Sequence, residues 1–183
     1  TSSNKISAGL GTIAKVVSYG EKIYSGKLHL SDALNRVNNY YLPYHDSLEK
    51  LINITKESFG GCALIDCHSM PSNRIGNGSR NNKSPADIVL GDNHGRSASK
   101  ALVNEIEDFF ISEGLSVKIN DPYPGGYTTS NYGKPKTGVQ AIQIEINRAL
   151  YMDEKSIKKN EGFLETKKVM DRLVSHLSKL IIV

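Results

Sequence analysis

Residues 64–72, LIDCHSMPS, place several side chains capable of chemistry at the end of an apolar run. A neutral imidazole at His68 could bind a divalent metal ion, although a histidine held by a carbonyl or a carboxylate is the alternative. Asp66 has the same strand parity as His68, so its carboxylate could orient the ring from behind a metal site. Capping the following loop is the other role open to Asp66.

A second polar group interrupts residues 140–150, QAIQIEINRAL, where isoleucines alternate along a predicted strand. Glu145 lies among them, and a buried acid needs a partner or a task. General base catalysis is one task, and an ion pair with Arg148 or another cation is the alternative. Asn147 and Arg148 follow directly. The guanidinium suits bidentate binding of a substrate carboxylate, while a structural salt bridge is its more common use.

Two loops carry the remaining candidates. LGDNHGRS, residues 90–97, has the composition of a tight turn, which favours a loop-shaping role for this segment and His94, with binding of metal or substrate as the alternative. The segment 120–138 combines glycines with tyrosines and contains Asn120 and Tyr127. It is predicted to be a lid or the rim of a pocket, or else an ordered surface loop.

The elements that must position these residues alternate between strands and amphipathic helices. Short apolar runs predict strands at 62–67, 87–92, 115–120 and 140–150, the first of them buried on both faces. Helical spacing predicts helices at 31–59, 99–114 and 161–180, with a kink or a division at Pro43. This order favours an α/β fold with a mainly parallel central sheet flanked by helices. We therefore expect the strand ends, with Asp66, His68, Asp92, Asn120 and Glu145, to converge on one site.

Composition sets the wider limits. With 183 residues, 38% of them hydrophobic, the chain is expected to form one α/β domain over residues 1–183. Lys and Arg outnumber Asp and Glu by 23 to 19 without a block of about five like charges, which does not favour nucleic acid as a partner. No apolar run approaches the ~18 residues of a membrane span. The two cysteines, Cys62 and Cys67, have opposite strand parity, so we expect no disulfide and a cytoplasmic location.

Three motifs together resemble the N-formylglutamate amidohydrolase family: DCHSMP at 66–71, VLGD.HG at 89–95 and Q.E.NRALYM at 143–152. They follow the order found in that family, and the resemblance extends from about Gly9 to Glu154. It implies an α/β fold of the zinc carboxypeptidase type. It also implies zinc-dependent hydrolysis of N-formyl-L-glutamate, or a similar small anionic N-acyl amino acid, to glutamate and formate.

The resemblance assigns roles residue by residue. His68 falls on a zinc-ligand position and Glu145 on the catalytic glutamate, while Arg148 is a candidate for binding a substrate carboxylate. Asn147, Asn120 and Tyr127 are expected beside the substrate.

Family members carry an upstream segment with further metal ligands, and this sequence begins after it. We therefore expect the remaining zinc ligands upstream, with a complementary N-terminal fragment as a candidate partner. A non-catalytic remnant or binding protein with an incomplete metal site is the alternative.

Overall fold

The computed structural model describes residues 11–17, 20–72 and 86–180. The chain forms two compact units, Thr1–Lys50 and Leu51–Val183, and each is described by itself. Helix α3 runs through the boundary between them. The prediction that residues 1–183 form a single domain stays a prediction. Among the described residues, no helix has both the length and the apolar character that a membrane crossing requires.

The predicted first helix is one continuous helical segment that changes its winding before Pro43. It comprises α2 (Leu30–Arg36), the π-helical turn η2 (Val37–Tyr41) and α3 (Leu42–Phe59). Pro43 has no N–H to donate, and a proline ring crowds the carbonyl four residues earlier, which here lies within η2. The expected disturbance at Pro43 is therefore a π turn. Gly60, with φ of 79°, ends α3 as predicted.

The second unit is built around a four-stranded sheet. Its strands lie in the order β1-β4-β2-β3 and comprise β1 (Cys62–Met70), β2 (Ile88–Gly91), β3 (Val117–Ile119) and β4 (Val139–Asn147). Besides the end of α3, the longer helices of the second unit are α4 (Lys100–Ser112) and α6 (Phe163–Leu177). The shorter elements are α5 (Tyr127–Tyr132), η3 (Pro135–Thr137), η4 (Arg148–Leu150), β5 (Met152–Asp153) and β6 (Lys158–Lys159). The predicted α/β class with flanking helices is confirmed.

The sheet is mixed, and this changes where its polar residues lie. β1 is parallel to β4 and β2 is parallel to β3, but β2 runs antiparallel to β4. The carboxyl ends of β2 and β3 therefore lie at the opposite end of the sheet from those of β1 and β4. The predicted convergence of all four strand ends is wrong, because an apolar run does not encode the direction in which its strand is paired.

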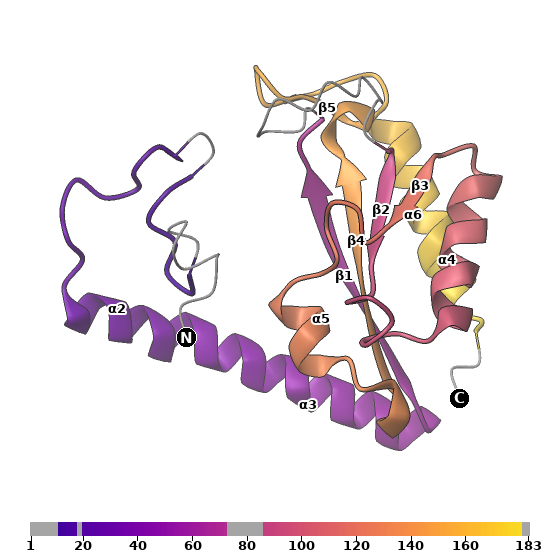
Figure 1. Ribbon diagram of the computed structural model, residues 1–183, viewed down its shortest axis with the longest axis horizontal. Helices are drawn as coiled ribbons and strands as arrows, with labels where there is room; N and C mark the ends of the chain where they lie inside the picture. The colour runs from indigo at the N-terminus through magenta and orange to yellow at the C-terminus, as the bar shows by residue number, and fades with distance from the viewer. Residues whose placement is uncertain (1–10, 18–19, 73–85, 181–183) are drawn as a thin grey trace. The chain divides into compact units, whose positions relative to one another are not determined.

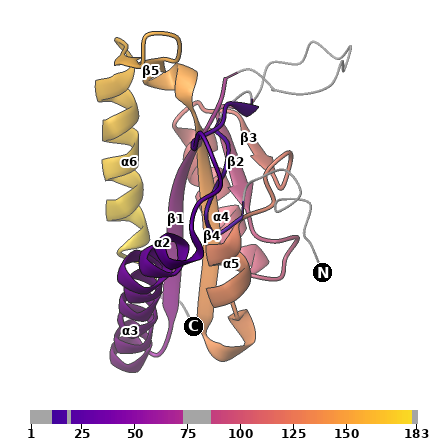
Figure 2. The ribbon, with the colours of Figure 1, turned by 90° about the vertical axis from the view of Figure 1, so that its left-hand side faces the viewer.

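One face of the sheet is covered by helices. Figure 1 shows α4 and α6 on one side of the strands and α5 on the other. Figure 2, turned by 90°, places α5 in front of β4 and α4 behind the strands. Buried residues of α4, including Ile106 and Phe110, pack with Ile142 and Ile144 of β4 and Leu173 of α6 in one hydrophobic core. Ser99 caps α4 by accepting a hydrogen bond from the backbone N–H of Leu102.

The other face is more polar, and here two predictions were wrong. β1 is not buried on both faces, since it is an edge strand whose fully buried residues are those at its two ends, Cys62 and Met70. The segment 120–138 is not wholly a loop, because it contains α5 and η3. The zinc carboxypeptidase type of fold stays a prediction.

Candidate functional site

The candidate site begins with the alternation of side chains along β4. Gln143, Glu145 and Asn147 share one face of this strand, while the intervening isoleucines point into the helical layer. Glu145 is only 6% exposed, and it lies beside Val89, which joins Met70 and Ala86 in a small apolar cluster. The sequence therefore predicted the position of Glu145 within a buried strand correctly.

Only one of the two oxygens of the Glu145 carboxylate has a hydrogen-bond partner among the described residues. Gln143 donates a hydrogen bond from Nε2 to Glu145 Oε1 at 2.5 Å. Oε2 of the same carboxylate is buried and has no hydrogen-bond partner among the described residues. Burial raises the pKa of Glu145, although His68 and the bond from Gln143 act in the opposite direction. A buried acid with one free oxygen is poised to accept a proton.

His68 lies beside Glu145 because their backbones are paired across β1 and β4. Its Nδ1 is 3.9 Å from Glu145 Oε1, and its Nε2 is 3.3 Å from Asp66 Oδ1. The structure thus brings together Asp66, His68 and Glu145, and it puts the Asp66 carboxylate within reach of the ring as expected. His68 lies inside β1 rather than beyond the strand end. Its side chain is 50% exposed and open to a ligand.

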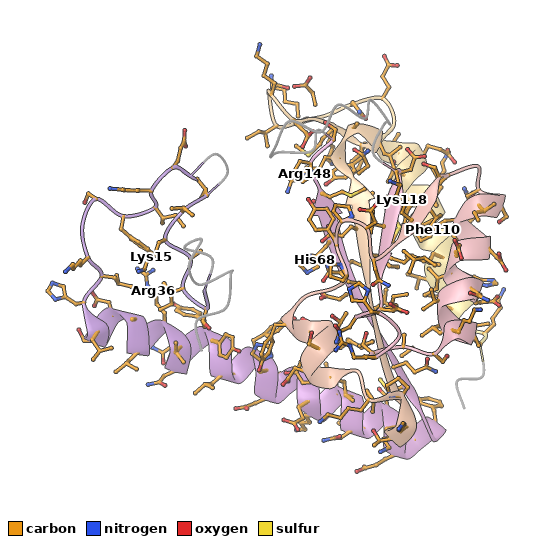
Figure 3. All side chains as sticks on the ribbon, in the orientation of Figure 1. Lys15, Arg36, His68, Phe110, Lys118 and Arg148 are labelled. Carbon is orange, nitrogen blue, oxygen red and sulfur yellow. The ribbon has the colours of Figure 1, made fainter. Side chains whose placement is uncertain are left out.

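Arg148 directly follows β4, and its side chain contacts Ser69 and Glu154. Its Nε donates to Ser69 Oγ at 3.2 Å, and its Nη1 lies 3.7 Å from Glu154 Oε1. Glu154 is itself held by the backbone N–H and the hydroxyl of Ser72. Within the described residues Arg148 forms no ion pair with Glu145, so its guanidinium is not the partner of the buried acid. Figure 3 shows His68 and Arg148 on the same side of the strands, with Phe110 of α4 on the opposite side.

The other predicted substrate neighbours lie apart from Glu145 or already have internal bonds. Asn147 donates to Ala86 O at 3.2 Å and accepts from the backbone N–H of Ala149 at 3.0 Å, which caps η4. Asn120 bonds through its amide to Asp92 at the far end of β2. Tyr127 opens α5 and is 55% exposed. Asn147 and Asn120 thus each hold a turn through these contacts.

The turn after β2 has the predicted loop-shaping form. Asn93 and His94 both have positive φ, and the carbonyl of Asp92 accepts hydrogen bonds from the backbone N–H groups of Arg96 and Ser97.

Both cysteines are free, and burial raises the pKa of the Cys62 thiol, which disfavours a thiolate nucleophile there.

Sequence reasoning missed Gln143 as the donor to Glu145, and Ser69 and Glu154 as the contacts of Arg148. Gln143 could have been found, because residues 143, 145 and 147 are polar at every second position of an otherwise apolar strand. The contacts of Arg148 depend on segments that lie far apart in the sequence and carried no such signal.

A catalytic zinc ion takes about three protein ligands and a water molecule. His68 has the chemistry of one ligand, and Asp66 could orient its ring. Within the described ranges, however, no group of three or more His, Cys, Asp or Glu side chains could hold a metal ion. The residues of the described site therefore do not fit a complete zinc centre by themselves.

Comparison with known proteins assigns the family. The model of the family described as N-formylglutamate amidohydrolase matches residues 2–152, which is most of the chain. The chain belongs to the N-formylglutamate amidohydrolase family. The crystal structure of N-formylglutamate amidohydrolase from Ralstonia eutropha JMP134 aligns with a TM-score of 0.91 at 32% identity, over 99% of this chain and 65% of that one.

Two curated N-formylglutamate deformylases are also similar to this member of the family. The protein from Pseudomonas aeruginosa is 34% identical over 63% of this chain and 43% of its own length. The protein from Pseudomonas putida is 31% identical over 61% of this chain and 41% of its own length. The matched regions thus span less than half the length of these relatives. A gene product of Agrobacterium tumefaciens, 17% identical with a TM-score of 0.61, shares the fold.

Proposed function

We propose that this chain carries the amide-hydrolysing residues of an N-formylglutamate amidohydrolase, which converts N-formyl-L-glutamate and water to glutamate and formate. Membership of the family and the names of the curated relatives support this substrate. They do not favour the alternative of a non-catalytic remnant. The observation that carries the proposal is the buried Glu145 carboxylate, whose Oε2 lacks a partner among the described residues beside a half-exposed His68.

The proposed chemistry uses Glu145 as a proton shuttle. Its carboxylate takes a proton from water while the water oxygen forms a bond to the formyl carbon. The C–N bond then breaks, and Glu145 returns the proton to the departing nitrogen, so that formate and the free amine of glutamate are released. Because burial raises the pKa of Glu145, it is a stronger base than an exposed glutamate.

Arg148 is proposed to bind a carboxylate of the substrate. Its side chain is 35% exposed, and its bonds to Ser69 hold the guanidinium beyond the carboxyl end of β4. A substrate carboxylate would compete with Glu154, whose nearest oxygen lies 3.7 Å from Arg148 Nη1. Tyr127 and, less directly, Asn147 and Asn120 are proposed to shape the surroundings of the substrate.

Zinc dependence is a separate proposal. His68 would supply one ligand, and the other ligands would come from residues outside those described. Bound zinc lowers the pKa of a coordinated water. Elemental analysis of the purified chain beside His68→Ala tests this, with about one zinc per chain lost in the variant as the expected result. Zinc bound equally by the two proteins would contradict a ligand role for His68, whereas no zinc in either would mean that the site is incomplete in the purified chain.

The hydrolytic function is tested by release of formate from N-formyl-L-glutamate, followed by proton NMR. The unmodified chain is expected to release formate, and Glu145→Gln is expected to be slower by about 10²–10⁴-fold. N-formyl-L-leucine is the matched control substrate, since it lacks the side-chain carboxylate. No formate release by the unmodified chain, or unchanged release by Glu145→Gln, would contradict the proposal.

A further inference from the structure

A hollow lies at the carboxyl end of β2, and the side chains of the proposed hydrolytic site do not line it. Its volume is about 790 Å³, and its walls come from the turn after β2, the first turns of α4 and the segment between α5 and β4. The charged residues that line it are Asp92, Arg96, Lys100, Lys134 and Lys136. Glu145, His68 and Arg148 are not among its lining residues. The charges around the hollow therefore come from residues other than those of the proposed hydrolytic site.

The basic side chains around this hollow have no acidic partners in the part of the chain that the structure describes. Across the described residues, none of Arg96, Lys100, Lys134 and Lys136 forms an ion pair, and all of them are exposed. The carboxylate of Asp92 is only 7% exposed and accepts a hydrogen bond from Asn120 at 2.7 Å. Four cationic side chains thus line one hollow, and the single acidic side chain that lines it is already hydrogen-bonded to Asn120.

The backbone that carries these cations is firmly held. A Cβ on Gly133 would lie 2.4 Å from Ser97 Cβ, so this close approach requires glycine and fixes the segment before Lys134 against the turn that carries Arg96. The backbone N–H of Lys134 donates to Val139 O at 2.7 Å. The backbone N–H of Ser99, the N-cap of α4, donates to Gln140 Oε1 at 2.8 Å. The cations are therefore brought together by packed structure, although their side chains reach solvent.

We propose that this hollow binds a small polyanion that carries phosphoryl groups. Its volume falls within the range of about 300–1,000 Å³ typical of small-molecule sites. Arginine binds phosphoryl oxygens in bidentate fashion, and lysines supply compact positive charge. The N-terminus of α4, a helix of 13 residues, adds a partial positive charge at the same wall. Four cations beside one engaged carboxylate match a multivalent anion better than a single carboxylate.

The test is a calorimetric titration of the full chain with inorganic pyrophosphate at about 0.15 M salt. Saturable binding is expected, and the double variant Lys134→Gln/Lys136→Gln should bind about tenfold more weakly or worse, because hydrogen bonds to charged groups contribute strongly to binding. The double variant Lys155→Gln/Lys158→Gln removes the same charge from the exposed β5–β6 hairpin, outside the hollow, and should bind like the unmodified chain.

The outcomes distinguish a specific binding site from nonspecific electrostatic attraction of the anion to the protein. Absence of saturable pyrophosphate binding would overturn the proposal, and so would equal weakening by the two double variants. Thermal melts of all three proteins check that the exposed substitutions leave the fold intact. A third variant, Lys100→Gln, should also weaken binding from the α4 wall. The proposal does not depend on hydrolysis of N-formylglutamate, since it is tested by binding alone.

Discussion

The two faces of strand β4 have opposite characters. On one face Ile142 and Ile144 are fully buried against α4 and α6. On the other, Gln143 and Glu145 are as deeply placed in the strand, but they leave buried polar atoms without partners among the described residues. The apolar face packs its side chains in the hydrophobic core, while the polar face leaves oxygens of Gln143 and Glu145 without partners among the described residues. We infer that the apolar face supplies the stability that allows the polar face to hold an ionisable group for chemistry.

The largest effect on stability is expected on the helical face. Phe110 is 0% exposed and packs in the core between α4 and the sheet. Phe110→Ala should lower the free energy of unfolding by about 3–5 kcal/mol, because it leaves a cavity in this layer. Urea denaturation followed by circular dichroism measures the change. Phe109→Ala, a neighbour only partly buried, is the matched control and should cost less. An equal loss from both would contradict the larger contribution expected from the fully buried ring.

On the polar face, Arg148 should affect the substrate more than the fold. Arg148→Gln is expected to raise KM for N-formyl-L-glutamate about 10–100-fold, since it removes charge-assisted hydrogen bonds to a carboxylate. Lys118→Gln is the control, because Lys118 is 34% exposed against 35% for Arg148 and already pairs with Asp121. Steady-state kinetics of formate release measure both variants. Similar changes in KM for the two variants would contradict a specific role of Arg148 in binding the substrate carboxylate.

The pH dependence of stability gives a smaller effect with a definite sign. Burial raises the pKa of Glu145, so the folded state binds this proton more tightly than the unfolded chain does. The resulting stabilisation is complete below the ordinary pKa of glutamate and is lost as pH rises through the raised pKa. Glu145→Gln lacks this contribution. Its stability relative to the unmodified chain should therefore increase with pH across that window, as measured by urea denaturation at several pH values.

The smallest effect is expected at the surface of the helical layer, with the opposite sign. Arg172 donates two hydrogen bonds to Glu113, at 2.8 and 2.6 Å, and this bond lowers the pKa of the Glu113 carboxyl. Its stabilisation is present above the ordinary pKa of glutamate and is lost as pH falls through the lowered pKa. Glu113→Gln should thus be slightly destabilised at neutral pH and equal to the unmodified chain in acid. Solvent screening keeps the difference small.

Local pattern in the sequence predicted the helical layer well. The helix at 99–114 was expected from its amphipathic spacing and the glycine beyond its end, and α4 lies within that range with Ser99 as its cap. The positions of Glu145 and His68 within or beside apolar runs identified the two residues that the structure pairs across β1 and β4. Hydrophobic periodicity was sufficient for these elements because each depends on its own residues.

Features set by long-range pairing could not be predicted in this way. The antiparallel pairing of β2 with β4 moves Asp92 and Asn120 to the opposite end of the sheet, and nothing in the short run IVLG indicates strand direction. Helix α5 was not found inside the segment 120–138, because it is only six residues long and is flanked by glycines. The pairing of Arg148 with Glu154 likewise depends on the fold of η4 and β5.

The most direct test of the two-face account compares neighbouring residues of β4, Glu145 and Ile144. For Glu145→Gln and Ile144→Val, the rate of formate release and the free energy of unfolding at pH 7 are measured on the same preparations. The account predicts that Glu145→Gln loses about 10²–10⁴-fold in rate without loss of stability. Ile144→Val should lose about 0.5–1.5 kcal/mol of stability and keep its rate. A Glu145→Gln protein that keeps its rate but unfolds more easily would show that Glu145 is structural, and would contradict the account.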